Sequence, residues 1–327
     1  MLRTYFFKVL VLLSVVFSYN LPADQPIKHN NKEIVYIVSD TRIPFWSIMA
    51  KGVESKAKEL GYGFSLYTAD NILKKELQNT VKTIKQKPAG VILSPTNSSS
   101  AVTILKLLKN ANIPVVISDI GTDSGEYVSF ISSNNEQGAY DIGRVLTKEM
   151  KKRGLDYGTV GIISIPQTRE NGKARTQGFM RALNEADIKA SNLYQQVDFS
   201  YKETYDFSME LIHNDPNLRA IWLQGSDRYK GALDAIKKAG KKGKILLICF
   251  DAEPIFLELI PNGVLVGAAM QQPFLMGEKA VESLDAHLNS LDVARKQQLP
   301  ILAISKENIK ENLKTIHRNV LGLNAKK

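Results

Sequence analysis

Short apolar runs alternate with helical patterns along almost the whole chain, and this alternation restricts the fold more than any other feature. Residues 34–38 (IVYIV) are apolar throughout, which is typical of a strand that is covered on both faces. Pro44 then favours a helix start, and the helical pattern ends at Gly61, a residue typical of helix C-termini. Further strands are predicted at 64–68, 90–94, 113–117 and 127–131, and, after a helix over about 135–153, at 160–165, 193–199, 220–223, 245–250 and 265–268.

Two series of such strands imply two domains. Strands that alternate with helices form parallel sheets wound by right-handed crossovers. A chain of 327 residues is long enough for two domains, each with its own core. The sequence therefore predicts an α/β protein with two doubly wound, Rossmann-like lobes.

The N-terminus reads as a secretory signal peptide. Arg3 and Lys8 precede the apolar run 9–17, and small and polar residues follow it. The run is shorter than the roughly 20 apolar residues that a membrane-spanning helix needs. We expect residues 1–20 to be removed on export to the periplasm; an uncleaved anchor is the alternative.

Composition argues against several classes of function. The net charge is +10, but the lysines are spread over helical faces, so no nucleic-acid partner is predicted. The four histidines are scattered, and the single Cys249 lies in an apolar run, so neither a metal site nor thiol chemistry is expected. The motifs of serine hydrolases, nucleotide-binding loops and zinc proteases are missing from the sequence. We predict a protein that is not an enzyme and needs no cofactor.

Polar residues follow most of the predicted strands. In an open α/β sheet, ligands bind beyond the carboxyl ends of the strands, and a cleft between two such sheets is a common small-molecule site. A sugar needs carboxylates and amides for its hydroxyls, a fixed fork of donors, and aromatic planes for its C–H faces. Seven residues supply that set: Phe45, Trp46, Asp119, Arg175, Phe199, Asp251 and Gln271.

Each candidate also has a purely structural interpretation. Asp119 and Asp251 follow strands, where an aspartate often caps the next helix. Arg175 fits an exposed helical charge pattern, and the three aromatic residues fit core packing.

Taken together, the motifs resemble the periplasmic sugar-binding proteins of ABC importers, the ribose- and galactose-type group (periplasmic binding protein type 1) that shares its core with LacI-like repressors. The resemblance covers about 33–305 and rests on the order and spacing of several segments: 34–40 with 44–46, 90–96, 112–119, 133–138, 174–179, 231–233, 249–251 and 271–273.

The resemblance implies a site and a mechanism. The aromatic candidates would stack on the sugar, and Asp119, Arg175, Asp251 and Gln271 would bond its hydroxyls. The lobes, 33–134 plus 272–297 and 135–271 plus 298–327, would be joined by three crossings near Asn134, near 271–272 and near 297. A monomer that closes around a small sugar-like ligand by hinge bending, and presents it to a membrane ABC permease, is the implied function.

Three positions depart from the family pattern. Ile43, Ile120 and Gly225 stand where the family often has asparagine, arginine and asparagine, which disfavours ribose itself. Arg42 is the candidate that would replace part of the lost donor capacity.

Two other functions fit the same core. A receptor for autoinducer-2 or a sugar would signal to a membrane histidine kinase or chemoreceptor. A LacI-like repressor would need a helix-turn-helix before the core, where this chain has its apparent signal peptide. The basic stretch 306–327 lies beyond the resemblance, and we expect a loosely packed tail there.

Overall fold

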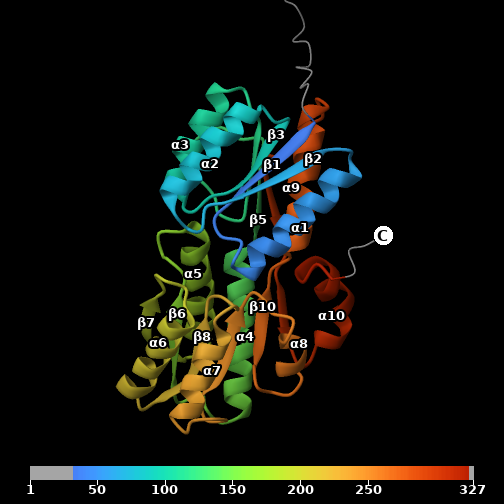
Figure 1. Cartoon of the computed structure of the whole chain (residues 1–327). Coiled ribbons are helices and arrows are strands. Elements are labelled where there is room, and N and C mark those ends of the chain that lie inside the picture. The colour runs from blue at the N-terminus through green and yellow to red at the C-terminus, as the bar shows by residue number, and fades with distance from the viewer. Residues whose placement is uncertain (1–31, 324–327) are drawn as a thin grey trace, which may run out of the picture.

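Two sheets form the centres of two lobes that are stacked end to end (Figure 1). The computed structural model describes residues 32–323, so the predicted signal peptide, 1–20, lies outside the described residues. The strand orders are β11-β5-β4-β3-β1-β2 and β12-β10-β9-β8-β6-β7. Because each lobe contains its own helix-covered sheet, the predicted fold class is confirmed.

The N-terminal lobe has a sheet that is parallel throughout. The sheet contains β1 (Glu33–Val38), β2 (Gly63–Thr68), β3 (Gly90–Ser94), β4 (Val115–Ser118), β5 (Ser129–Ser133) and β11 (Lys296–Leu299). Its helices are α1 (Pro44–Glu59), α2 (Leu73–Gln86), α3 (Ser98–Asn110) and α9 (Pro273–Leu288). Alternate residues of β1 pack on opposite sides, with Tyr36 in the core shared with α1 and α9 and Val35 in the core shared with α3.

The C-terminal lobe repeats this plan with one antiparallel edge. Its sheet contains β6 (Thr159–Ser164), β7 (Lys189–Gln195), β8 (Leu218–Leu223), β9 (Leu246–Phe250), β10 (Gly267–Met270) and the antiparallel β12 (Leu302–Ser305). Its helices are α4 (Asn135–Lys152), α5 (Glu170–Glu185), α6 (Tyr201–Asn214), α7 (Tyr229–Lys238), α8 (Phe256–Leu259) and α10 (Ile309–Thr315), followed by a π-helical turn, η1 (Ile316–Val320). Cys249 is fully buried in this lobe, as its apolar surroundings predict.

The edge strands differ from the sequence prediction. β7 spans Lys189–Gln195 rather than 193–199, which places Phe199 in a loop beyond the strand. β11 and β12 were not predicted at all. β7 and β11 are only partly buried, so they lack the continuous apolar runs that mark the central strands.

Three crossings join the lobes. They lie between β5 and α4, between β10 and α9, and between β11 and β12. The third falls at 300–301 rather than near 297, because Lys296–Leu299 pairs with β5 of the N-terminal lobe. The predicted lobe boundary at 297 therefore falls inside β11, and the boundary lies at 300–301 instead.

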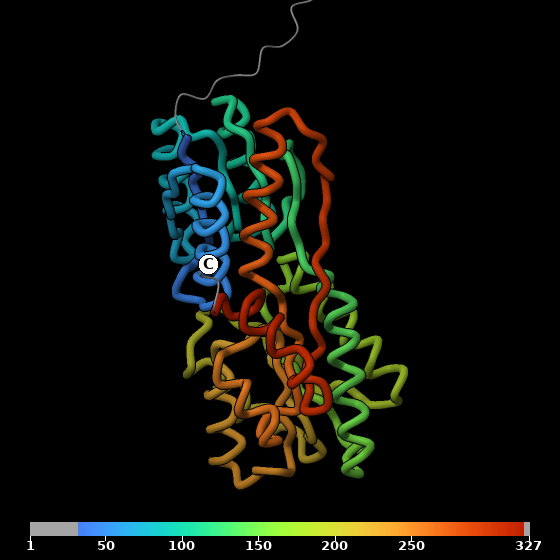
Figure 2. Tube along the Cα trace, turned by 90° about the vertical axis from the view of Figure 1, so that its right-hand side faces the viewer, coloured from blue at the N-terminus to red at the C-terminus, as the bar shows by residue number. Residues whose placement is uncertain are grey.

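The C-terminal segment is packed, which contradicts the predicted loose tail for residues 309–323. Ile316 and Val320 are buried, and the segment lies beside the lower end of α9 where the lobes meet (Figure 2). Arg318 forms an ion pair of 2.9 Å with Glu278 of α9, and Asn319 Nδ2 donates to Gln272 Oε1 at 2.8 Å. The end of the chain thus braces the second crossing. Within residues 32–323 no helix has the length and apolarity to cross a bilayer.

Candidate functional site

The carboxyl ends of both sheets meet at a small cavity between the lobes. Its walls come from the N-terminal lobe, the C-terminal lobe and the second crossing. The lining residues are Ile43, Phe45, Trp46, Asp119, Ile165, Arg169, Asn171, Arg175, Gln196, Phe199, Gln224, Gly225, Asp227, Asp251 and Gln271. The structure thus brings together all seven of the residues that the sequence nominates on sugar chemistry.

Asp119 and Asp251 occupy corresponding places in the two lobes. Each directly follows a central strand, β4 or β9, and each has a left-handed backbone, with φ of 68° and 65°. Their amides donate to the neighbouring strands, Asp119 to Ile131 O at 2.9 Å and Asp251 to Ala269 O at 2.8 Å. Neither caps a helix, since a strand is the next element after Asp119 and α8 begins only at Phe256. Such strained positions concentrate at functional sites.

Arg175 is held rigidly on the inner face of α5. It is 3% exposed, which rules out the interpretation as a surface charge. Its Nε donates to Asn135 Oδ1 at 2.8 Å and its Nη1 to the carbonyl of Gln224 at 2.9 Å. The guanidinium lies 3.8 Å from the Phe250 ring centre, and Nη1 lies 3.7 Å from Asp251 Oδ2. Packing and hydrogen bonds therefore fix the direction in which its remaining donors point.

Aromatic rings line the cavity from both lobes. Pro44 starts α1, so Phe45 and Trp46 lie in its first turn at the end of the cleft. Trp46 Nε1 donates to Asp119 Oδ2 at 3.1 Å, which joins an aromatic wall to a carboxylate of the same lobe. Phe199 of the C-terminal lobe has a left-handed backbone (φ 51°), and its carbonyl accepts a hydrogen bond from Arg228 Nε. Trp46 also belongs to the core of its lobe, so its packing role and its place in the cavity coexist.

Three buried acceptor atoms in the cavity have no partner among the described residues. They are Asp119 Oδ1, Asn171 Oδ1 and Gln271 Oε1. Gln271 orients this oxygen by donating its own amide to Asp251 Oδ1 at 2.7 Å. A buried acceptor without a donor costs about 1–3 kcal/mol, so these atoms favour a ligand that brings several hydrogen-bond donors.

The carboxyl groups around the cavity are weaker acids than usual. Burial raises the pKa of Asp119 to about 6, against the opposing effect of Arg175. Burial likewise raises the pKa of Asp227 to about 6 and that of Glu253 to about 7. At neutral pH, Asp119 and Asp227 are largely ionised and ready to accept hydrogen bonds, but a modest acidification protonates them.

The structure leaves Arg42 outside this cavity. Its side chain is 69% exposed and donates to Asp40 from Nε at 2.8 Å and from Nη2 at 2.6 Å. It lines a second cavity, of about 260 Å³, closer to Asp70 and Asn71. The sequence suggested that Arg42 replaces a donor lost from the ligand site. Its position outside the cavity contradicts that prediction.

Sequence reasoning missed Arg169 and Asn171. Arg169 belongs to the segment that joins β6 to α5, whereas Asn171 lies in the first turn of α5. Residues 167–169 are one of the polar stretches after a strand. The position of Arg169 in that stretch was the available signal, but nothing in the sequence indicates how far its side chain reaches, and no such signal marks Asn171.

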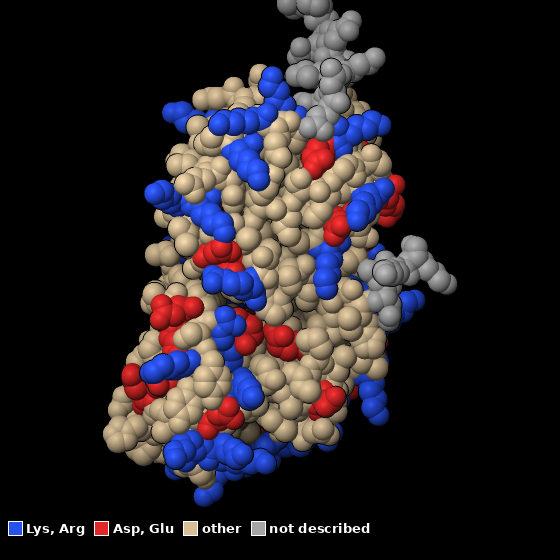
Figure 3. Space-filling view, viewed as in Figure 1, with Lys and Arg blue, Asp and Glu red and all other residues tan. Residues whose placement is uncertain are grey.

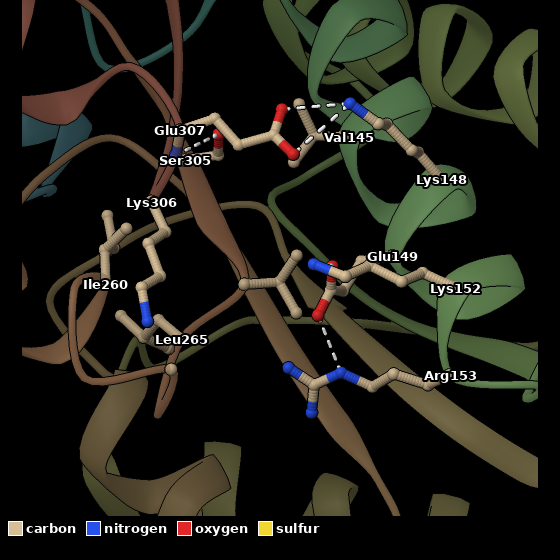
Figure 4. A pocket seen from close by; sticks show the side chains of 12 residues that line it. Val145, Lys148, Glu149, Lys152, Arg153, Ile260, Leu265, Ser305, Lys306 and Glu307 are labelled. Atoms are coloured by element: carbon tan, nitrogen blue, oxygen red, sulfur yellow. Dashed lines mark hydrogen bonds and ion pairs between the residues drawn. The ribbon is translucent and has the colours of Figure 1, made fainter.

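Another hollow lies on the C-terminal lobe, beside α4 and β12. Lys148 bonds Glu307 and Arg153 bonds Glu149, so both of its acidic side chains are already paired, and its lining is basic on balance (Figure 4). On the face drawn in Figure 3, basic and acidic side chains are interspersed around the lobe junction. Within residues 32–323 no cluster of His, Cys, Asp and Glu is arranged to hold a metal ion.

Comparison with known proteins agrees with this arrangement. Residues 34–292 match the family model of the periplasmic binding protein domain. The chain belongs to this family. Among the relatives of this periplasmic binding protein, the ribose import binding protein of Escherichia coli (strain K12) is 27% identical over 276 residues, which cover 84% of this chain and 90% of the relative. The D-apiose import binding protein of Actinobacillus succinogenes is 23% identical over 305 residues, which cover 92% of this chain and 97% of that relative.

Solved structures show the same fold. An ABC transporter solute binding protein from Agrobacterium vitis, bound with α-D-tagatopyranose, superposes with a TM-score of 0.79 at 22% identity. The match covers 88% of this chain and 98% of that protein. These relatives are binding proteins of transporters and not enzymes, in line with the sequence prediction of a binding function.

Proposed function

We propose that this periplasmic binding protein binds a small sugar or sugar-like polyol in the interlobe cavity and delivers it to an ABC importer. The proposal rests on the set of unpartnered acceptors, Asp119 Oδ1, Asn171 Oδ1 and Gln271 Oε1, in a cavity that aromatic rings line from both lobes. Hydroxyl groups donate to such acceptors, and the C–H faces of a sugar pack against aromatic rings.

The charge balance of the cavity favours a neutral ligand. The lining contains three carboxylates, Asp119, Asp227 and Asp251, and two guanidinium groups, Arg169 and Arg175. Asp227 forms an ion pair with Arg228 beside the cavity, so the negative and positive groups are balanced. A neutral polyol uses both kinds of partner, because each hydroxyl both donates and accepts.

The family departures point away from ribose. Ile43 and Gly225 line the cavity without offering a polar side chain, whereas Ile120 is buried in the core of the N-terminal lobe. The seven residues that the resemblance assigns to the sugar site are present, but the hydrogen-bond donors that these three positions often carry in the family are missing. We infer a ligand that differs from ribose in the placement of its hydroxyls.

Binding would be coupled to movement of the lobes. A ligand that bonds both strand-end aspartates stabilises the closed arrangement by its difference in affinity for the closed and open forms. The closed form is then what a permease recognises. Export to the periplasm after removal of residues 1–20, and function as a monomer, complete the proposal. The importer is favoured over a sensor kinase because the relatives named above are import proteins.

A thermal-shift screen of the mature protein tests the proposal. Pentoses, hexoses, polyols and autoinducer-2 are each added at increasing concentration, and the unfolding temperature is measured. A ligand at 100 times its dissociation constant adds about 2.7 kcal/mol to the free energy of unfolding. We expect the unfolding temperature to rise and saturate with increasing concentration of one sugar, and to rise less with its epimers. A screen in which none of these compounds shifts the unfolding temperature would sink the assignment to sugars.

A further inference from the structure

Arg169 crosses the cleft between the lobes. Its backbone belongs to the C-terminal lobe, where it immediately precedes α5. Its Nη2 donates to the carbonyl of Thr96 and to Oδ1 of Asn71, both at 3.2 Å. These two acceptors follow β3 and β2 of the N-terminal lobe. One side chain therefore links the lobes directly, at the rim of the ligand cavity.

The remaining donors of Arg169 are unused. A guanidinium has five N–H groups, and Nε and Nη1 of Arg169 donate to no atom of residues 32–323. The residue is nevertheless only 6% exposed, and it has no carboxylate within ion-pair distance in the described chain. Burial lowers the pKa of Arg169 to about 10, so the group is still charged at neutral pH. Nε and Nη1 are not sealed from solvent, so a ligand that reaches them can supply hydrogen-bond partners to this nearly buried charged group.

The position of the guanidinium indicates what that partner is. Its carbon lies 5.9 Å from the ring centre of Trp46 and 5.7 Å from that of Phe199. These rings come from opposite lobes and line the same cavity. The unused donors are therefore in reach of any ligand that occupies the space between the aromatic walls.

Arg169 also limits the extent of that space. Together with Ile43 and Phe199, it lines both the ligand cavity and the second cavity of about 260 Å³. It therefore forms part of the wall between the two. A ligand in the ligand cavity meets the guanidinium where a larger molecule would have to extend into the second cavity.

We propose that Arg169 is a specificity-determining residue, which binds an acceptor oxygen of the ligand through Nε and Nη1 while Nη2 holds the N-terminal lobe. Recognition of one oxygen and closure of the lobes are thereby coupled through a single guanidinium. The ligand contact rests on the proposed function, whereas the link between the lobes does not. A lysine cannot replace this group, because its compact ammonium lacks the planar fork that serves two directions.

Two measurements on Arg169→Ala test the proposal, with Lys173→Ala as the matched control. Lys173 carries the same charge and lies exposed on the same helix, outside the cavity. Calorimetric titration with the best sugar from the screen should show an affinity about 10- to 100-fold lower for Arg169→Ala, as expected for a lost hydrogen bond to a charged group. Arg169→Lys should lose nearly as much, and Lys173→Ala should bind like the parent.

The second measurement needs no ligand. Spin labels on Leu73→Cys and Val197→Cys, exposed residues of opposite lobes, report the separation of the lobes. In the doubly labelled protein without sugar, the substitution Arg169→Ala should shift the distribution of label-to-label distances to larger values. Lys173→Ala should leave this distribution unchanged. Arg169→Gln serves as a second variant if the alanine variant does not fold.

The proposal requires both changes. Parental affinity in Arg169→Ala, or an unchanged distance distribution without ligand, overturns it. A screen without any bound sugar contradicts the proposed function alone, since the distance measurement still tests the link between the lobes.

Discussion

Asp251 illustrates how single residues combine charge and backbone strain at this site. Its carboxylate contacts Arg175 of α5 and Gln271 of the second crossing, and its backbone is left-handed. The strand-end pattern of the sequence identified Asp251 and three others, Asp119, Phe199 and Gln271. Arg175, Phe45 and Trp46 lie on helices and were selected for the chemistry that a sugar needs and through the family resemblance. The sequence did not identify Arg169, because the contacts of that side chain with Asn71 and Thr96 exist only once the lobes have come together.

Asp251→Asn should weaken ligand binding without unfolding the protein. Asparagine has the same shape and tolerates a left-handed backbone, but it loses the charge that faces Arg175 and accepts ligand hydroxyls. We expect an affinity about 10- to 100-fold lower by calorimetry, with an intact circular dichroism spectrum. Asp292→Asn, at an exposed position outside the cavity, is the control. Equal affinities of the two variants would remove Asp251 from the site.

Close helix pairs position the site at the scale of elements. A Cβ on Gly178 of α5 would lie 1.9 Å from the carbonyl oxygen of Glu136 in α4, so the two helices touch through their backbones. A Cβ on Gly52 of α1 would lie 2.1 Å from the Phe274 oxygen of α9, which repeats this contact in the other lobe. The central elements were predictable from their apolar runs, whereas β11 was not, because its sequence KQQL carries no such run.

Gly178→Ala should therefore disturb both stability and binding. The added methyl forces α5 away from α4, and Arg175, one turn earlier, bonds Asn135 at the start of α4. We expect the free energy of unfolding, measured with urea, to fall by about 1–3 kcal/mol, and the ligand affinity to fall with it. Gln177→Ala, exposed on the same helix, should change neither. Parental stability of Gly178→Ala would show that the helices separate at no cost.

At the scale of the whole molecule, the buried acids make stability and binding respond to pH in opposite directions. Asp119 and Asp227 have a pKa of about 6 in the folded protein and Glu253 about 7, against ordinary values near 4 in an unfolded chain. Between about pH 4 and 7 the folded protein binds more of these protons. The contribution of these acids to the free energy of unfolding is thus largest at low pH and is lost as the pH rises through 6 to 7.

Melting curves and titrations at pH 5 and 7.5 check this prediction. The protein without ligand should gain stability from these carboxyls at pH 5, whereas sugar affinity should drop there because a protonated Asp119 is a weaker acceptor for a ligand hydroxyl. Asp119→Asn, which removes one of the titrating groups, should flatten the pH dependence of stability. A steeper dependence in that variant would contradict the assigned pKa direction.

The central claim is that one small ligand is bound by the strand ends of both lobes. Hydrogen–deuterium exchange of the mature protein, with and without the best sugar, tests this most directly. If both lobes bind the sugar, exchange should slow at 43–46 and 119–120 of the N-terminal lobe, and also at 169–175 and 251–252 of the C-terminal lobe. Protection confined to one lobe, with the sugar shown to be bound, would contradict this claim.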